Sequence, residues 1–172
     1  MIISLTGFMG CGKSSVGKRL SELLCCRFMD LDAEIVARAG RSIADIFAVD
    51  GESEFRRIEK EVLREILDTS SSSVLALGGG AVMTEGSEEL VHEKTLCVYL
   101  KASVDTLVEH LTGETSGRPL LNQETSLRKR ILELMSLRAE IYQRTAHLII
   151  ETDGKSIDEI ANEIIKLKHT IL

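Results

Sequence analysis

Short apolar runs alternate along the chain with longer segments in which apolar residues recur at helical spacing. The runs that predict buried strands are residues 2–5, 26–29, 74–77, 95–100 and 147–150. The predicted helices are residues 13–24, 33–39, a short helix capped by Ser42 that runs to Phe47, a longer helix after Gly51, and residues 104–111, 126–142 and 157–167. Strands that are apolar throughout are buried on both faces, so the alternation predicts an α/β fold with a parallel sheet between helices. Ligands of such folds bind at the carboxyl ends of the strands.

The chain has the length of one domain. It contains 172 residues, and we find no internal repeat, low-complexity segment or interdomain linker. Residues 112–125 are the longest segment without a periodic pattern, and they include the only proline, Pro119. We therefore expect a lid over the ligand site in this segment.

Compartment signals favour a cytoplasmic protein. No apolar stretch approaches the roughly 20 residues of a membrane span, and the apolar start of the chain lacks the basic residues of a signal peptide. The cysteines Cys11, Cys25, Cys26 and Cys97 show no zinc-binding spacing, and we expect free thiols in a reducing compartment. Cys11 is either a small residue that fits a glycine-rich loop or a reactive thiol.

Charge and aromatic content argue against nucleic acid as a partner. The chain has 27 acidic residues against 21 lysines and arginines, a net charge of -6, 3% aromatic residues and no tryptophan. It therefore lacks both a general basic field and an aromatic stacking surface. An anionic ligand would have to be held by a few positioned cations.

Residues 7–14 have the sequence GFMGCGKS and match the phosphate-binding pattern GxxxxGK[ST] between a predicted strand and a predicted helix. Backbone N–H groups and the positive end of the helix dipole would bind phosphate. Lys13 would reach the β- and γ-phosphates, and Ser14 would place its hydroxyl on Mg²⁺. The pattern predicts nucleoside triphosphate binding but leaves the reaction open. We expect the nucleotide to contact Gly10, Cys11, Gly12, Lys13, Ser14 and Ser15.

Two aspartates follow the second predicted strand. Asp30 and Asp32 stand two residues apart, and on an extended segment this spacing points both side chains the same way. Asp30 is a candidate for a water-mediated contact to Mg²⁺, and Asp32 for accepting a hydroxyl proton or orienting that hydroxyl. The alternative is helix capping with solvent exposure, and Asp32 could also serve as an N-cap.

Two arginines lie on the apolar side of predicted helices. Arg138 follows Leu127, Ile131 and Leu134 at helical spacing, and Arg56 lies on an apolar edge of its own helix. An arginine on a buried side needs an anion. Each arginine therefore either binds an anionic ligand group or forms a structural ion pair with an acidic residue.

Three glycines and a loop arginine complete the candidates. Gly78, Gly79 and Gly80 follow the third predicted strand, where they either bring bare N–H groups to the same crevice or form a plain turn. Arg118 lies in the expected lid, next to Pro119, which favours an extended backbone. It either neutralises charge on a transferring phosphoryl group or is a solvated loop residue.

Six motifs occur together along essentially the whole chain. They are GFMGCGKS at 7–14, DLD at 30–32, FRRIE at 55–59, LGGG at 77–80, RPLL at 118–121, and R…Y…A at Arg138, Tyr142 and Ala146. The phosphate loop alone is generic, but the order and spacing of the other five are specific. In this combination the chain resembles the shikimate kinase family.

The resemblance implies a three-layer P-loop kinase fold, similar to nucleoside monophosphate kinases. This fold has a five-stranded parallel sheet of order 2-3-1-4-5, helices on both faces and a mobile lid. Within a single domain it implies a core at 1–31 and 74–111, an acceptor-binding region at 32–67, a lid at 112–125 and a C-terminal core at 126–172. We expect a monomer, because no extra apolar surface helix is evident.

The resemblance also implies the reaction. ATP would phosphorylate the 3-hydroxyl of shikimate, with Mg²⁺ as cofactor, in the pathway to chorismate and aromatic amino acids. The implied catalytic residues are Lys13, Asp32 and Arg118, and the implied metal contacts are Ser14 and Asp30. The implied substrate-binding residues are Asp32, Phe47, Phe55, Arg56, Gly78, Gly79, Gly80 and Arg138. The two substrate-binding arginines would hold the carboxylate, and the two phenylalanines would flank the ring.

The chain departs from the family pattern at the expected adenine contacts. Many members carry an arginine just before the lid that touches adenine, whereas this chain has His110 and Leu111 there. The segment 151–155, which would form the other adenine loop, is short and atypical.

Two rival functions remain compatible with the sequence. One is another small P-loop kinase, such as a gluconate or nucleoside monophosphate kinase, although a nucleotide acceptor calls for base-reading polar groups. The other is a non-catalytic shikimate-sensing module, which we would expect to have lost Lys13, Asp32 or Arg118. This chain keeps all three residues.

Overall fold

The structure is a computed structural model that describes residues 1–69, 71–112 and 126–171. Its elements are β1 (Ile2–Thr6), α1 (Lys13–Leu23), β2 (Arg27–Asp30), α2 (Leu31–Ala39), α3 (Ile43–Thr69), β3 (Ser73–Ala76), the 3₁₀ helix η1 (Ala81–Met83), α4 (Ser87–Lys94), β4 (Thr95–Lys101), α5 (Val104–Leu111), α6 (Leu127–Thr145), β5 (Leu148–Glu151) and α7 (Ile157–Ile171).

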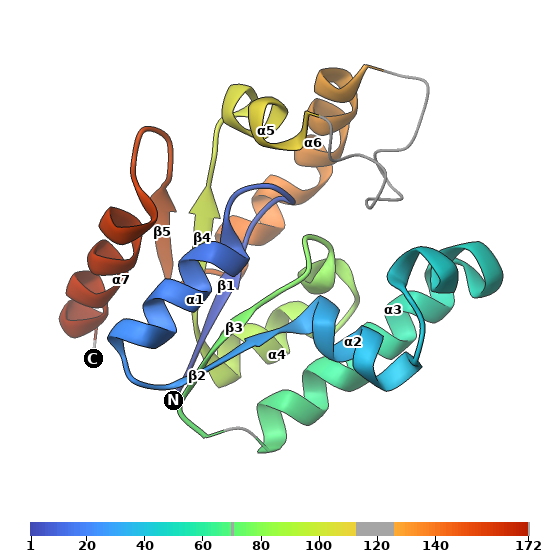
Figure 1. Cartoon of the computed structure of the whole chain (residues 1–172), viewed down its shortest axis with the longest axis horizontal. Helices are drawn as coiled ribbons and strands as arrows, with labels where there is room; N and C mark the ends of the chain where they lie inside the picture. The colour runs from blue at the N-terminus through green and yellow to red at the C-terminus, as the bar shows by residue number, and fades with distance from the viewer. Residues whose placement is uncertain (70, 113–125, 172) are drawn as a thin grey trace.

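The described strands form one parallel sheet with the order β2-β3-β1-β4-β5. This confirms the predicted α/β class and the strand order that the family resemblance implied. β1 lies at the centre, where Ile2 pairs with Ser73 of β3 and with Thr95 of β4. Because all strands run in one direction, their carboxyl ends meet at one edge, the upper edge of the sheet in Figure 1.

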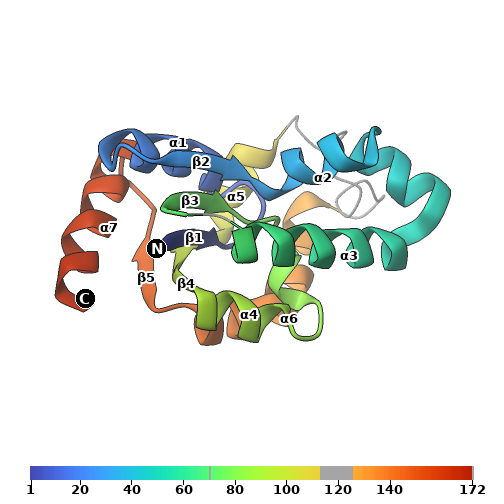
Figure 2. The same ribbon diagram turned by 90° about the horizontal axis from the view of Figure 1, so that it is seen from below.

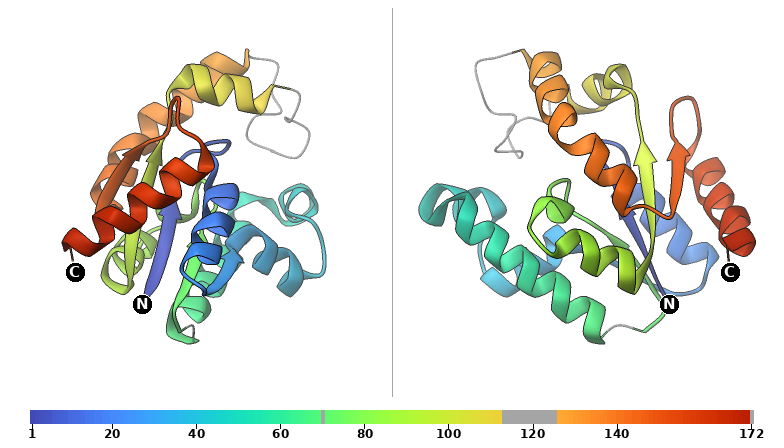
Figure 3. Two further views of the ribbon diagram at one scale, coloured as in Figure 1. Left: turned by 60° about the vertical axis from the view of Figure 1, so that its left-hand side comes forward. Right: turned by 180° about the vertical axis from the view of Figure 1, so that it is seen from behind.

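Helices cover both faces of the sheet. α1 and α7 lie side by side on one face, and α4 and α6 pack on the other (Figure 2 and Figure 3). α2 and α3 extend from the β2 side (Figure 1). The sheet core is aliphatic, with Leu5, Val98 and Leu100 fully buried. None of the helices in the described part of the chain combines the length and the apolar character that a membrane crossing requires.

The stretch after β3 contains two elements that the apolar pattern did not predict. η1 and α4 form there, and α4 buries only Ser87 and Val91. An eight-residue helix with so few buried residues has no apolar stripe to detect. Its signals are instead electrostatic: acidic residues in its first turn and basic residues in its last. The helices predicted at 126–142 and 157–167 also run further, to Thr145 and Ile171.

Candidate active site

A cleft of about 840 Å³ opens at the carboxyl ends of the strands. Parts of the chain that are distant in sequence line it, from residues 9–15 to the segment between β5 and α7. The candidates that line it are Gly10, Gly12, Lys13, Ser14, Ser15, Asp30, Asp32, Phe47, Phe55, Arg56, Gly78, Gly79, Gly80 and Arg138. Cys11, another candidate, is instead buried beside the cleft. Arg118 belongs to the predicted lid and lies outside the described residues.

The P-loop, residues 7–14, turns sharply between β1 and α1. Gly10 and Gly12 have φ angles of 84° and 94°, a left-handed conformation that glycine adopts without strain. Gly12 is the N-cap of α1, and no side chain caps this helix. The first N–H groups of α1 therefore have no intrahelical partner, and together with the helix dipole they form an anion site.

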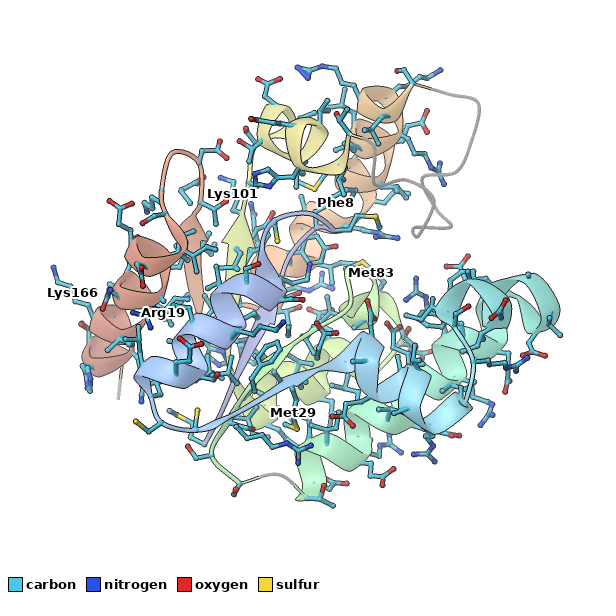
Figure 4. All side chains as sticks on the ribbon, in the orientation of Figure 1. Phe8, Arg19, Met29, Met83, Lys101 and Lys166 are labelled. Atoms are coloured by element: carbon cyan, nitrogen blue, oxygen red, sulfur yellow. The ribbon has the colours of Figure 1, made fainter. Side chains whose placement is uncertain are left out.

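Lys13 is held inside the P-loop. Its Nζ donates to the carbonyl oxygens of Gly7 and Phe8, each at 2.9 Å, and the residue is 8% exposed. Phe8 lies on the side of the loop that faces α5 and α6 (Figure 4). To bind a terminal phosphate, the ammonium group must exchange carbonyl oxygens for phosphate oxygens, so the loop keeps this cation next to the anion site.

Asp30 connects the P-loop helix to α2. Ser14 Oγ donates to Asp30 Oδ2 at 2.6 Å. Asp30 Oδ1 accepts from the N–H groups of Asp32 and Ala33 at 3.1 and 3.4 Å, so Asp30 is the N-cap of α2. The prediction that Asp32 could be the cap was wrong, as was the extended geometry assumed for the pair. The strand ends at Asp30, and Asp32 already lies in the first helical turn.

The Ser14–Asp30 pair fits the requirements of Mg²⁺. This ion keeps several waters and usually binds to one or two protein groups together with substrate phosphates. Within the described residues, no cluster of three or more histidine, cysteine, aspartate or glutamate side chains could hold a metal by itself. A metal held jointly with a nucleotide needs only the hydroxyl and the carboxylate that the pair provides.

Two carboxylates converge on Gly78. A β-carbon on Gly78 would stand 2.8 Å from Asp32 Oδ1 and 3.1 Å from Glu59 Oε1. A side chain at position 78 would therefore force the Asp32 carboxylate to move and would crowd Glu59, so this close approach favours glycine. Asp32 and Glu59 therefore reach the same side of the cleft from α2 and α3.

Glu59 lines the cleft but was not among the predicted site residues. It is 1% exposed and accepts from Arg56 Nη1 at 2.7 Å, while Arg56 Nη2 donates to Glu52 at 3.3 Å. Burial raises the pKa of Glu59 above its usual value, although Arg56 opposes the shift. The available signal was spacing, because Glu59 follows Phe55 and precedes Leu63 by one helical turn each. The structural ion pair that was one interpretation of Arg56 thus exists, at the wall of the cleft.

Arg138 has no comparable carboxylate partner in the described residues. It is 7% exposed, as its helical phase predicted, and its Nη1 donates to the carbonyl oxygen of Gly79 at 3.4 Å. No salt bridge of Arg138 is found among the described residues, unlike Arg56. The hydroxyl of Tyr142 also donates to the Gly79 oxygen. The cleft thus contains a buried guanidinium with donors to spare.

The chain that forms this cleft is similar to known proteins over almost its whole length. A family model described as shikimate kinase matches residues 9–168. The chain belongs to the shikimate kinase family. A shikimate kinase from Dictyoglomus turgidum is 41% identical over 166 residues, 95% of each chain. One from Thermus thermophilus is 43% identical over 164 residues, 95% of this chain and 88% of the relative.

Solved shikimate kinase structures agree in fold. The enzyme from Acinetobacter baumannii, in complex with shikimate, has a TM-score of 0.93 at 34% identity, covering 98% of this chain and 93% of that chain. The enzyme from Aquifex aeolicus has a TM-score of 0.81 at 31% identity, covering 99% and 98%.

In this shikimate kinase family member, a break in α3 builds an aromatic wall. Gly51 has φ 83° and ψ 173° inside α3, so the loop predicted there shrinks to one non-helical residue. The ring centroids of Phe47 and Phe55 lie 4.7 Å apart, although eight residues of straight helix would span about 12 Å. The Arg56 guanidinium lies 5.1 Å from the Phe55 ring centroid, within cation–π range.

The two segments where the sequence departs from the family pattern both reach the cleft of this shikimate kinase family member. His110 at the end of α5 lines the cleft, and so do Lys155 and Ser156 from the loop before α7. They bring an imidazole, an ammonium group and a hydroxyl to the lining of the cleft.

Proposed function

We propose that the chain transfers the γ-phosphoryl group of ATP to the 3-hydroxyl of shikimate, giving shikimate 3-phosphate and ADP. The observation that carries this proposal is the joining, in one cleft, of an uncapped P-loop helix with the buried Arg138, the partly buried Arg56 and the Asp32 carboxylate. A carboxylated polyol offers a carboxylate to the arginines and a hydroxyl to Asp32, and the P-loop helix then serves the nucleotide phosphates. Family membership supports the same reaction, and we place it in aromatic amino acid biosynthesis, in the cytoplasm.

On the nucleotide side, the P-loop N–H groups and Lys13 would bind the phosphates. Ser14 and Asp30 would hold Mg²⁺, which when bound neutralises charge on the phosphates. Arg118, in the predicted lid region 112–125, is proposed to approach the same phosphates. These assignments use Lys13 and Arg118 to balance charge on the nucleotide, so a few positioned cations act within a chain of net charge -6.

On the acceptor side, Arg138 would bind the shikimate carboxylate with its fork of donors. Arg56 would contribute from a second helix, α3, while Glu59 fixes its orientation. The wall formed by Phe47 and Phe55 would pack on the ring, and the N–H groups of the 78–80 loop would border the site.

The transfer needs little covalent chemistry from the protein. The phosphoryl group passes between two oxygens in line, so rate comes from positioning and from neutralising charge. Asp32 would hydrogen-bond to the 3-hydroxyl of shikimate and orient the lone pair of the hydroxyl oxygen toward the γ-phosphorus. It would accept the hydroxyl proton as the new O–P bond forms. Glu59 lies beside Asp32 at Gly78, so two carboxylates border the position proposed for the 3-hydroxyl.

A coupled ADP-release assay across shikimate, gluconate and nucleoside monophosphates tests the proposal. We expect turnover with shikimate alone. Turnover with another acceptor would refute the substrate, and stoichiometric shikimate binding without turnover would favour a sensor. Asp32→Asn should lower kcat by about 10²–10⁴-fold, the typical contribution of a general base. A change in ATP affinity alone would contradict the acceptor role of Asp32.

We also propose that the chain works as a monomer, since one chain supplies every residue assigned above. Sedimentation velocity of the active enzyme tests this, and a stable dimer at assay concentration would contradict it.

A further inference from the structure

His110 joins the end of α5 to the P-loop. Its Nδ1 lies 2.8 Å from the carbonyl oxygen of Gly10. A carbonyl oxygen can only accept, so Nδ1 carries the proton and donates. The next residue, Leu111, packs on the same glycine, because a β-carbon on Gly10 would stand 2.8 Å from the Leu111 Cγ. The last turn of α5 therefore holds Gly10 by a hydrogen bond and a van der Waals contact.

The peptide unit between Gly10 and Cys11 is hydrogen-bonded at both ends. Its oxygen accepts from His110, and its N–H donates to the carbonyl oxygen of Phe8 at 3.2 Å. Since a peptide unit is planar, bonds at its two ends fix its orientation. Gly10 has the φ angle of 84° given above, and glycine has the most backbone freedom to lose. The tether therefore acts where the P-loop is least constrained by its own sequence.

We propose that His110 is a positioning residue that orders the P-loop for phosphate binding. This inference rests on the proposed function only in taking ATP as the phosphate donor. The N–H groups after the tethered peptide belong to Gly12 and to the first turn of α1, where no side-chain cap holds them. Fixing the preceding peptide reduces the conformational entropy that this segment loses when phosphate binds. His110 thus acts on the phosphates through Gly10.

The competing role for His110 is direct contact with the nucleotide base, because its side chain also lines the cleft. The two roles predict different ligand dependence. A tether affects every ligand that has the phosphate chain, whereas a base contact affects only ligands that have a base. Inorganic tripolyphosphate has the chain and lacks the base, so it separates the two roles.

The test is calorimetric titration of MgATP, tripolyphosphate and shikimate into the wild type and the variants His110→Leu, His110→Gln and His110→Asn. The asparagine amide can donate from near the Nδ1 position, whereas the glutamine amide reaches toward Nε2. We expect the leucine and glutamine variants to bind both MgATP and tripolyphosphate about two- to tenfold more weakly, the effect of one hydrogen bond. The asparagine variant should restore both affinities, and shikimate affinity should not change. In turnover, the KM for ATP should rise while kcat stays near the wild-type value.

Three results would overturn the tether. A loss confined to MgATP would assign His110 to the base, and equal affinities in all variants would leave it no role. A fall in Tm in the asparagine variant as large as in the leucine variant, without restored affinity, would indicate a structural role. The proposed function fails separately, if the wild type binds MgATP and tripolyphosphate but does not phosphorylate shikimate.

Discussion

Replacing Arg138 by alanine should separate acceptor binding from nucleotide binding. Arg138 is 7% exposed, and it donates a long hydrogen bond to the Gly79 carbonyl oxygen. It forms no salt bridge among the described residues, so its donors are available to the substrate carboxylate. Arg138 comes from α6, whereas Ser14 and Asp30 belong to α1 and β2, so its loss should leave the nucleotide contacts in place.

The expected magnitude follows from the kind of bond that is lost. A hydrogen bond between charged groups contributes about 1.5–3 kcal/mol, so the KM for shikimate should rise about 10- to 150-fold. The KM for ATP should stay within about twofold, which corresponds to less than about half a kcal/mol. Arg138→Lys keeps the charge but not the fork, and its KM should fall between those of alanine and wild type.

Steady-state kinetics with each substrate varied in turn measures these constants. The matched control is Arg144→Ala on the same helix, since Arg144 pairs with Glu88 and its side chain is 60% exposed. That variant should keep both KM values. If Arg138→Ala and Arg144→Ala give the same shikimate KM as the wild type, the assignment of the carboxylate to Arg138 is refuted.

Three further predictions concern the P-loop and the stability of the fold. Lys13→Ala should abolish turnover in the coupled assay, because the loop then lacks its internal cation; wild-type activity would disprove the P-loop assignment. Arg56→Ala should lower the free energy of unfolding by about 3–5 kcal/mol in urea titrations, since Glu59 is left as a buried, unpaired charge; Arg56→Met combined with Glu59→Gln should recover most of this loss. Burial lowers the pKa of His147 from its usual 6.5, and its Nδ1 must stay unprotonated to accept from the Cys97 N–H. As the pH falls, His147 is therefore protonated in the unfolded chain before it is protonated in the folded protein. The free energy of unfolding should be highest above about pH 6.5 and should decline below that pH. His147→Asn should reduce this decline.

The parts of the site that local rules specify could be predicted. The P-loop follows from a glycine pattern between a strand and a helix, and burial of Arg138 follows from helical phase. Both features depend on residues that are close together in sequence, and the packing of the whole chain does not change them. The strand order came from the family resemblance, because parallel strands of similar composition do not specify which neighbours they choose.

The missed features depend on contacts between distant elements. Glu59 resembles the other acidic residues of a charged helix, and only the packing of α2 and α3 against the 78–80 loop brings it beside Asp32. The wrong prediction that Asp32 caps α2 has a similar cause. The side chain of Asp30 could cap α2 or face solvent, and the hydrogen bond from Ser14 of α1 helps to hold it in the capping position. The sequence signal for α4 is weak, and the helix is stabilised instead by its packing on β4 and α6.

The central position of β1 sets an order of events during synthesis. β1 leaves the ribosome before both of its neighbours in the sheet, β3 and β4, whose residues Ser73 and Thr95 pair with Ile2. The P-loop continues directly from the end of this strand and lies against β4, because a β-carbon on Gly7 would stand 2.6 Å from the Leu100 carbonyl oxygen. We therefore expect the loop to reach its final shape only after β4 has been made. Contacts so distant in sequence slow folding and leave an apolar strand waiting in the nascent chain. We therefore expect a truncated product that ends before β4 to be bound by chaperones or degraded by proteases rather than to bind nucleotide weakly.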